Sequence, residues 1–395
     1  MISMNGRFKH EKRFLLFIPE YVLGGAETQF RYLIDYAEKN KWKLDVAVGH
    51  RVKKDDELLR EAIKHMKNVR FYEFDWRNAS NKKLLLDTAI YILRSFPRVR
   101  YSACLIHHPA DLVLAPILKL LGIYVIYSER LDASAVSRDF WLRKCLWFCN
   151  RILANSPYAK KELELMTGRN VGLIRNGKPD MEMFPIKEGR KIDRILIPAN
   201  IYPRKNQMLM LRYLKRHPDF RGKLVLAGYL TDKTYWFKLI HFIKINNLQD
   251  KVEFLGYVED LKEEYRKADL VILPSLAEGS PNVVLEAYTC GRPVIVSDIE
   301  AERDIVRNPR LRFGVKNVTE LEACIQYVQG LSDEAYRQLL EENHRFVLKN
   351  YNIEEMAEAF YRELSEGTRC SLWKPGIMRF THFYKDTAIR KGNEK

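Results

Sequence analysis

Two glutamates eight residues apart, Glu278 and Glu286, flank a turn that could bind an anionic ligand. Pro281 lies between them and is well placed to open a helix, because its ring fixes φ near the helical value. The start of a helix presents backbone N–H groups without partners, so it can bind a phosphate. The two carboxylates can accept hydrogen bonds from hydroxyl groups. The spacing therefore indicates a ligand with both phosphate and hydroxyl groups, such as a sugar nucleotide.

These residues belong to one predicted strand–turn–helix unit. An apolar run at 268–273 predicts a buried strand, and the residues after Pro281 predict a helix. The same unit recurs throughout α/β proteins, so an ordinary structural turn is the alternative to a ligand site. The spacing alone leaves both interpretations open.

The alternation of strands and helices extends over both halves of the chain. Asn176-Gly177-Lys178-Pro179 carries the helix and strand breakers of a linker. Strands that alternate with helices predict parallel sheets covered on both faces. We therefore predict an α/β protein with two doubly wound, Rossmann-like domains facing each other across a cleft, at 1–180 and 181–364, and a basic tail at 365–395. The expected strands lie at 14–18, 44–48, 103–106, 122–127, 151–154, 194–198, 223–227, 252–255, 268–273 and 293–297.

Doubly wound domains bind ligands at the carboxyl ends of their strands, where three further pairs of residues are expected. Gly24 and Gly25 lie in the first loop of the first half, where glycine lets a ligand approach the backbone. The second half has two cations in its equivalent loop, which could clamp a diphosphate. The two cations in that second loop are Arg204 and Lys205. The third pair, His107 and His108, lies at the end of another strand. The glycines also fit an ordinary tight turn, the cation pair a solvated surface, and the histidines a structural role at the end of a strand.

The positive charge lies mainly in the first half of the chain. The whole chain of 395 residues has a formal net charge of +16. Residues 1–190 contain 34 Lys and Arg against 22 Asp and Glu, whereas residues 191–395 contain 33 against 29. A basic first half indicates an anionic partner, which could be a membrane surface, a lipid-linked phosphate or a nucleic acid. No nucleic-acid recognition motif accompanies the charge, so we expect no nucleic-acid partner.

The segment 139–153 combines aromatic and basic side chains. A helix of this composition can lie in a membrane interface with its cations facing anionic head groups, although packing in the core also explains the aromatic residues. The basic residues of this segment are Arg143, Lys144 and Arg151, and Arg138 lies directly before it.

The sequence predicts a cytoplasmic protein with reduced thiols, in peripheral contact with the inner face of a membrane. The six cysteines have no paired metal-ligand spacing, and no histidine cluster accompanies them, so we expect no metal site. The apolar run at 14–18 is too short for a signal peptide, and the apolar region 112–127 is interrupted before it could span a bilayer.

With these motifs together, the chain resembles glycosyltransferase family 4, the retaining, group 1 glycosyltransferases of the GT-B fold. The resemblance extends to about residue 364. It is carried by the segments 254–258, 273–275, 278–282, 285–287 and 291–295, with Gly24-Gly25-Ala26-Glu27 and Asn176-Gly177 as further matches.

The resemblance implies sugar transfer with retention, without a bound metal or cofactor, from a UDP- or GDP-sugar. Glu278 would contact the donor sugar, and Glu286 would bind the ribose hydroxyls. Lys205 would bind the diphosphate, with Arg204 beside it. The remaining donor contacts would come from Gly279, Ser280, Pro281 and Asn282 near the sugar and diphosphate, and from Tyr257 and Val258 near the base.

Two positions depart from the family pattern. The family usually has Arg five residues before the lysine, where this chain has Asn200. Many members have His after the strand near Tyr127, where this chain reads Ser128-Glu129-Arg130. On the acceptor side, the predicted residues are His107, His108, Glu129 and Arg130.

The resulting prediction is a glycosyltransferase that acts on a lipid-linked glycan of a cell-surface polysaccharide pathway. The missing Arg leaves a non-catalytic sugar-nucleotide-binding protein as the alternative.

Overall fold

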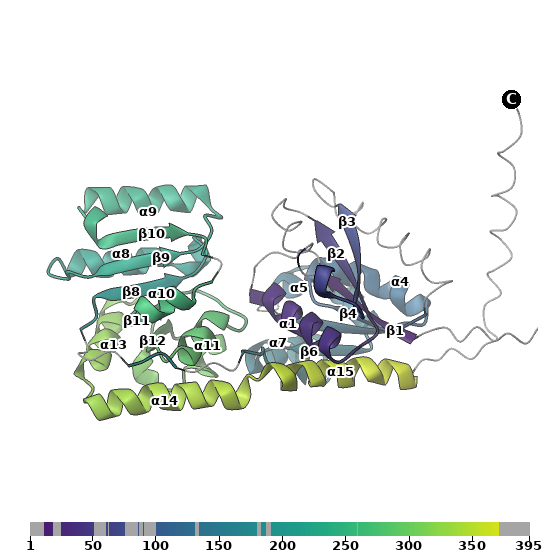
Figure 1. Ribbon diagram of the computed structural model, residues 1–395. Helices are drawn as coiled ribbons and strands as arrows, with labels where there is room; N and C mark the ends of the chain where they lie inside the picture. Colours follow the sequence, from purple (N-terminus) through teal and green to yellow (C-terminus); the bar gives the residue numbers. More distant parts are fainter. Residues whose placement is uncertain are drawn as a thin grey trace, which may run out of the picture.

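The structure, a computed structural model, describes most of the two predicted domains. The described residues are 12–18, 25–50, 61, 63–75, 86, 90, 100–130, 134–179, 183–186, 191–258 and 260–370. They form two α/β units side by side, connected at the bottom by two long helices (Figure 1). These helices are α14 (Asp333–Asn350) and α15 (Ile353–Cys370).

The first sheet has seven described strands in the order β3-β2-β1-β4-β5-β6-β7, and all of its strand pairs are parallel. Its apolar runs, such as Leu15 to Ile18, are almost continuous, as expected for strands that helices cover on both faces. The strands expected from the sequence are present, and β3 and β7 add the two edges. The strands are β1 Lys12–Ile18, β2 Leu44–His50, β3 Arg70–Asp75, β4 Arg100–Ile106, β5 Tyr124–Glu129, β6 Arg151–Ala154 and β7 Gly172–Leu173.

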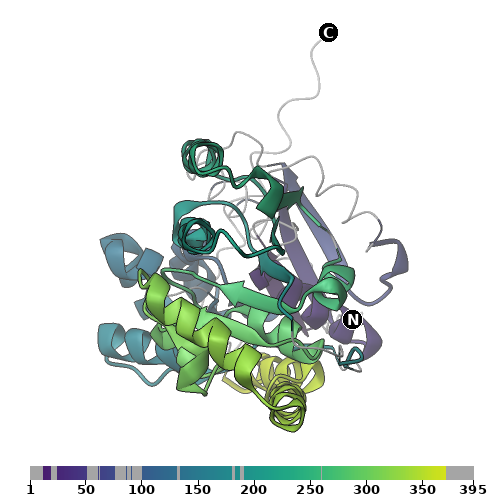
Figure 2. The same ribbon diagram turned by 90° about the vertical axis from the view of Figure 1, so that its left-hand side faces the viewer.

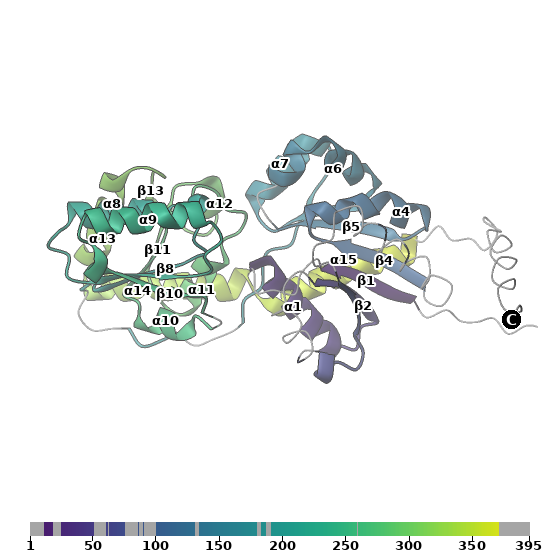
Figure 3. The same ribbon diagram turned by 90° about the horizontal axis from the view of Figure 1, so that it is seen from above.

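The helices of the first unit lie on both faces of this sheet (Figure 3). The described ones are α1 Gly25–Lys39, η1 Pro109–Leu114, α4 Ala115–Leu120, α5 Ser134–Arg138, α6 Phe140–Cys145, η2 Leu146–Phe148 and α7 Pro157–Thr167.

The second sheet has six described strands in the order β10-β9-β8-β11-β12-β13, again all parallel. Both sheets are therefore doubly wound, as predicted. The strands are β8 Arg194–Pro198, β9 Lys223–Ala227, β10 Val252–Gly256, β11 Leu270–Leu273, β12 Val294–Ser297 and β13 Arg312–Phe313. The helices are η3 Pro203–Lys205, α8 Gln207–Arg216, α9 Lys233–Ile245, η4 Gln249–Lys251, α10 Lys262–Lys267, α11 Asn282–Thr289, α12 Glu300–Arg303, η5 Pro309–Leu311 and α13 Val318–Gly330.

Helix α15 returns the chain to the first sheet. Met356, Phe360 and Leu364 are buried in the core of the first unit, against α1 and β4. The predicted domain limit at residue 364 therefore falls inside this helix. Helices α14 and α15 lie at the bottom in Figures 1 and 2, so the chain crosses twice between the units. Within the described ranges, no helix combines the length and the apolar character needed to cross a membrane.

Candidate functional site

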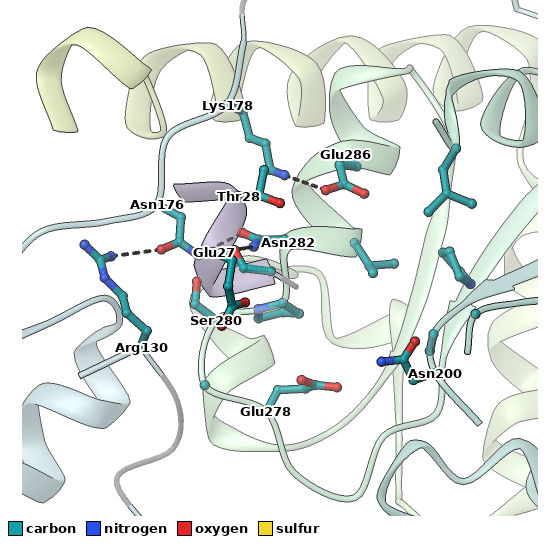
Figure 4. Close-up of a pocket in the computed structure, with 18 of the residues that line it drawn as sticks. Glu27, Thr28, Arg130, Asn176, Lys178, Asn200, Glu278, Ser280, Asn282 and Glu286 are labelled. Atoms are coloured by element: carbon teal, nitrogen blue, oxygen red, sulfur yellow. Dashed lines mark hydrogen bonds and ion pairs between the residues drawn. The ribbon is translucent and has the colours of Figure 1, made fainter. Parts of the chain in front are cut away.

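A cavity of about 750 Å³ lies between the two units, and residues of both line it. Its walls are the loops at the carboxyl ends of the strands, the position expected for ligands of doubly wound sheets. Among the residues predicted from the sequence, Glu278, Lys205 and Glu286 face it from the second unit, and His107 and His108 face it from the first. Figure 4 shows this cavity.

Lys205 and Glu278 form an ion pair in the cavity, with 2.5 Å between Nζ and Oε1. Lys205 ends the loop after β8, and Glu278 lies in the loop after the neighbouring strand β11. Arg204 ties the same loops together, because its Nε donates to the carbonyl of Ala277 over 2.7 Å. The predicted cation pair and the first carboxylate thus meet at one point.

The second carboxylate, Glu286, is held by two groups. Lys178 Nζ lies 2.6 Å from its Oε1, and the Tyr265 hydroxyl donates to its Oε2 over 2.9 Å. Lys178 comes from the segment that the sequence indicates as a linker, and its side chain is almost fully buried. Burial and the Glu286 charge raise the pKa of Tyr265, so its hydroxyl stays protonated as a donor. Neither partner is predicted from the sequence, because nothing near Lys178 or Tyr265 signals a distant carboxylate.

Asn282, at the first position of α11, joins the two units. Its Nδ2 donates to the carbonyl of Gly25 over 2.7 Å, and its Oδ1 accepts from Asn176 over 2.8 Å (Figure 4). A Cβ on Gly25 would lie 2.8 Å from Asn282 Nδ2, so a larger residue here would displace the Asn282 amide. Gly24 lies outside the described residues. Gly279, Ser280 and Pro281 line the cavity before the helix.

Two residues of the predicted base site also line the cavity. Tyr257 and Val258 follow β10, and the Tyr257 ring stacks on Tyr229 with 4.2 Å between ring centroids. Asn200, at the position of the expected Arg, is exposed, and its Oδ1 accepts from the Tyr229 backbone N–H. Its short amide thus supports the loop that carries Tyr229.

On the first unit, His107 is buried and its ring stacks on Phe30 with 4.1 Å between centroids. Burial, then the nearby His108 and Arg130, hold the pKa of His107 well below its ordinary value, so the imidazole is neutral. His108 Nδ1 accepts from the Ala110 backbone N–H and caps η1.

Glu129 and Arg130 are both buried at the end of β5. Glu129 accepts from the Tyr127 hydroxyl over 2.8 Å. Arg130 donates to Asn176 over 3.0 Å, and its guanidinium lies 4.8 Å from the Phe360 ring centroid. Burial, opposed by Glu129, lowers the pKa of Arg130 to about 9. Figure 4 shows the guanidinium pointing to Asn176 and away from Glu278. The structure thus brings Arg130 to the linker.

One further carboxyl group lies behind the site. Glu302, in α12, is fully buried, and neither of its oxygens has a hydrogen-bond partner among the described residues. Burial, then the nearby Glu278 charge, raises the pKa of Glu302 well above its ordinary value, against the opposing effect of Lys205. We therefore take this group as a neutral carboxylic acid. In the sequence it looks like any helical glutamate.

The site can bind a phosphorylated ligand through cations and helix amides. Within the described ranges, no three His, Cys, Asp or Glu side chains come together in a way that could hold a metal ion. Lys205, Arg204 and the backbone at the start of α11 supply the positive groups.

Curated relatives match parts of this chain. The O-antigen biosynthesis glycosyltransferase WclY of Escherichia coli is 25% identical over 213 residues, which cover 51% of this chain and 58% of that protein. The uncharacterized glycosyltransferase MJ1607 of Methanocaldococcus jannaschii is 32% identical over 160 residues, 38% of this chain and 37% of that protein. The O-antigen chain mannosyltransferase RfbU of Salmonella typhimurium is 25% identical over 239 residues, 59% of this chain and 66% of that protein. The matches thus span less than two thirds of these relatives.

Solved structures match almost the whole chain. Anabaena Alr3699/HepE in complex with UDP and glucose has a TM-score of 0.73 at 17% identity, covering 89% of this chain and 99% of that one. Sucrose-phosphate synthase (tll1590) from Thermosynechococcus elongatus has a TM-score of 0.76 at 18% identity, covering 90% and 100%. These likenesses confirm the predicted fold. The chain has the GT-B fold, and its residues 181–345 match the family described as glycosyl transferases group 1.

Proposed function

We propose that this protein is a glycosyltransferase that moves a sugar from a nucleotide-sugar donor to an acceptor, with retention at the anomeric carbon. The observation that carries the proposal is the Lys205–Glu278 pair, which lies in a cleft between two doubly wound units beside the start of α11. The family match of residues 181–345 and relatives with glycosyltransferase names support the same activity.

The donor would lie along the second unit. Its diphosphate would contact Lys205, Arg204 and the amides of 279–282, and its ribose would bind Glu286. The base, of UDP or GDP, would contact the backbone near Tyr257 and Val258. Since Lys205 already holds Glu278, the diphosphate must compete for this ammonium group. Glu278 would then accept from the sugar hydroxyls.

Catalysis would rest on stabilising the leaving diphosphate. Negative charge develops on the β-phosphate as the bond to the anomeric carbon breaks, and a preorganised cation with helix amides can stabilise it without reorganisation. Removing one such donor in other enzymes costs about 10²–10³-fold in rate.

The acceptor would bind the basic first unit, where His107, His108, Glu129 and Arg130 were predicted. A lipid-linked glycan of a cell-surface polysaccharide is our preferred acceptor, because relatives act in O-antigen synthesis by name.

A membrane contact through α6 and η2 would bring this acceptor within reach of a cytoplasmic enzyme. No residue of α6 is buried, and Trp141 and Trp147 are 74% and 67% exposed. Core packing therefore does not account for these two aromatic side chains. Arg143 and Lys144 are exposed beside them, as expected for contact with anionic head groups.

The test is a thermal-shift screen of the full chain with UDP-, GDP- and ADP-sugars, followed by mass spectrometry of the acceptor. We expect one donor class to stabilise the protein and Glu278→Gln to abolish transfer. The exposed pair Lys191–Asp193 supplies a control in Lys191→Ala, which should change neither result. If no sugar nucleotide stabilised the protein at millimolar concentration, the donor site would be refuted. Donor binding without turnover on any acceptor would favour the non-catalytic alternative.

A further inference from the structure

Helix α9 of the second unit has an unusual composition for a surface helix. Its thirteen residues, Lys233–Ile245, include three lysines and one histidine and no acidic residue. Tyr235, Leu239 and Ile243 pack into the core of the second unit. These three side chains hold the helix on the sheet, but they do not account for the apolar residues on its outer face.

The outer face of α9 exposes two large apolar side chains. Phe237 is 68% exposed and Ile245 is 61% exposed, and His241 lies between them at helical spacing. With about 100° per residue, Lys238 and Lys244 fall on the two edges of this apolar stripe. Both lysines are exposed. We call these five residues the α9 face.

Among the described helices and strands, none covers the α9 face. Helix α9 is the outermost element on the side of the second unit opposite α14, and the view from above shows its outer side uncovered (Figures 1 and 3). Among the described residues, no acidic group forms an ion pair with Lys238 or Lys244. In α10, by contrast, Arg266 and Lys267 pair with Glu263 and Glu264. The charge of the α9 face is therefore left for an external anion.

We propose that the α9 face docks on an anionic membrane surface. An apolar stripe with lysines on both edges matches a helix that lies in the head-group region, because lysine stems can cover apolar surface while their ammonium groups reach the phosphates. The proposed function supplies only the reason for this docking, since a lipid-linked acceptor would need the donor-binding unit near the bilayer. The binding itself requires neither donor nor acceptor.

The test is sedimentation of the full chain with vesicles of phosphatidylcholine, with or without phosphatidylglycerol. We expect binding only to the anionic vesicles and a loss on adding salt. Phe237→Ser and Ile245→Ser should each lower the partition coefficient about tenfold, the effect of withdrawing one large apolar side chain from the interface. Lys238→Gln with Lys244→Gln should weaken binding to anionic vesicles and reduce its dependence on salt.

The matched control is Leu165→Ser on α7, where the leucine is 74% exposed. It should leave vesicle binding unchanged. All variants should keep the thermal shift with a UDP- or GDP-sugar, which separates a failed docking surface from a failed donor site. Vesicle binding that persists unchanged in the Phe237 and Ile245 variants would overturn the proposal. So would a dimer of the wild-type chain that these variants dissociate while lipid binding is unaffected, because the face would then bind a second copy.

Discussion

Lys205 and Glu278 are 73 residues apart in the sequence, and their charged atoms lie 2.5 Å apart in the cleft. They meet because β8 and β11 are neighbours in the second sheet, so the loops after these strands share one edge. Under the proposed function, a donor diphosphate would have to take Lys205 from Glu278, which would couple occupation of the phosphate site to release of the carboxylate.

The first prediction concerns this lysine. Lys205→Ala should lower kcat/KM for the donor by about 10²-fold or more, because the leaving diphosphate loses a preorganised cation. Steady-state kinetics with Lys191→Ala as the control measures this effect. An unchanged kcat/KM would show that Lys205 does not contact the diphosphate.

A second prediction concerns the linker. Lys178→Met should reduce the free energy of unfolding by about 1–3 kcal/mol, since it leaves the half-buried Glu286 with Tyr265 as its remaining hydrogen-bond partner among the described residues. The donor KM should rise as well, because Glu286 loses its fixed orientation. Urea unfolding and donor titration measure the two effects. A variant that loses stability but binds donor normally would assign Lys178 a purely structural role.

The contact between Gly25 and Asn282 can be tested by a double-mutant cycle. Gly25→Ala should lower activity, because its new Cβ would lie 2.8 Å from Asn282 Nδ2 and displace the amide that donates to the Gly25 carbonyl. Asn282→Ala removes that obstacle and should make the Gly25→Ala change nearly silent. We expect a coupling energy of about 0.5–3 kcal/mol between the two substitutions. Additive effects would show that the contact does not join the units.

Glu302 predicts a pH dependence of stability. Its pKa is raised in the folded chain, so the folded state keeps a proton that the unfolded state releases above about pH 4.3. Stability should therefore fall as the pH rises above this value, until the folded group also ionises. Glu302→Gln carries no such proton and should lack this loss. The Tm of the variant should equal that of the wild type near pH 4 and exceed it at pH 7–8. Each 1 kcal/mol of unfolding free energy that the wild type loses corresponds to about 2–4 °C in Tm. A Tm difference that does not change with pH would contradict a neutral Glu302.

The basic residues around α6 should differ in their effect on membranes. Arg143 and Lys144 are exposed, so neutralising them together with Arg138 should weaken vesicle binding. Arg151 lies 3.1 Å from Glu363 on α15. Arg151→Gln should therefore leave vesicle binding unchanged and lower stability, by about 1 kcal/mol or less for a partly exposed pair. Sedimentation with anionic vesicles and thermal unfolding distinguish these outcomes. Equal loss of vesicle binding in both sets would contradict this division of roles.

The sequence by itself determined the α/β class and the positions of the main strands. Short apolar runs such as 195–198 and 270–273 indicate buried strands when turns and helical patterns alternate with them. Pro281 likewise marked the start of α11 correctly, because the geometry of proline acts locally. These signals depend on neighbouring residues and are therefore legible in the chain.

Only the tertiary structure decided which distant groups meet. Nothing near Lys178 indicates that it reaches Glu286, and the apolar pattern of α15 does not say that Phe360 packs in the first unit rather than the second. Periodicity shows that a face is apolar but not what covers it, as the exposed Phe237 and Trp141 demonstrate. The sequence likewise does not show that Glu302 is buried, because burial of a carboxyl group results from packing across strands and leaves no local pattern.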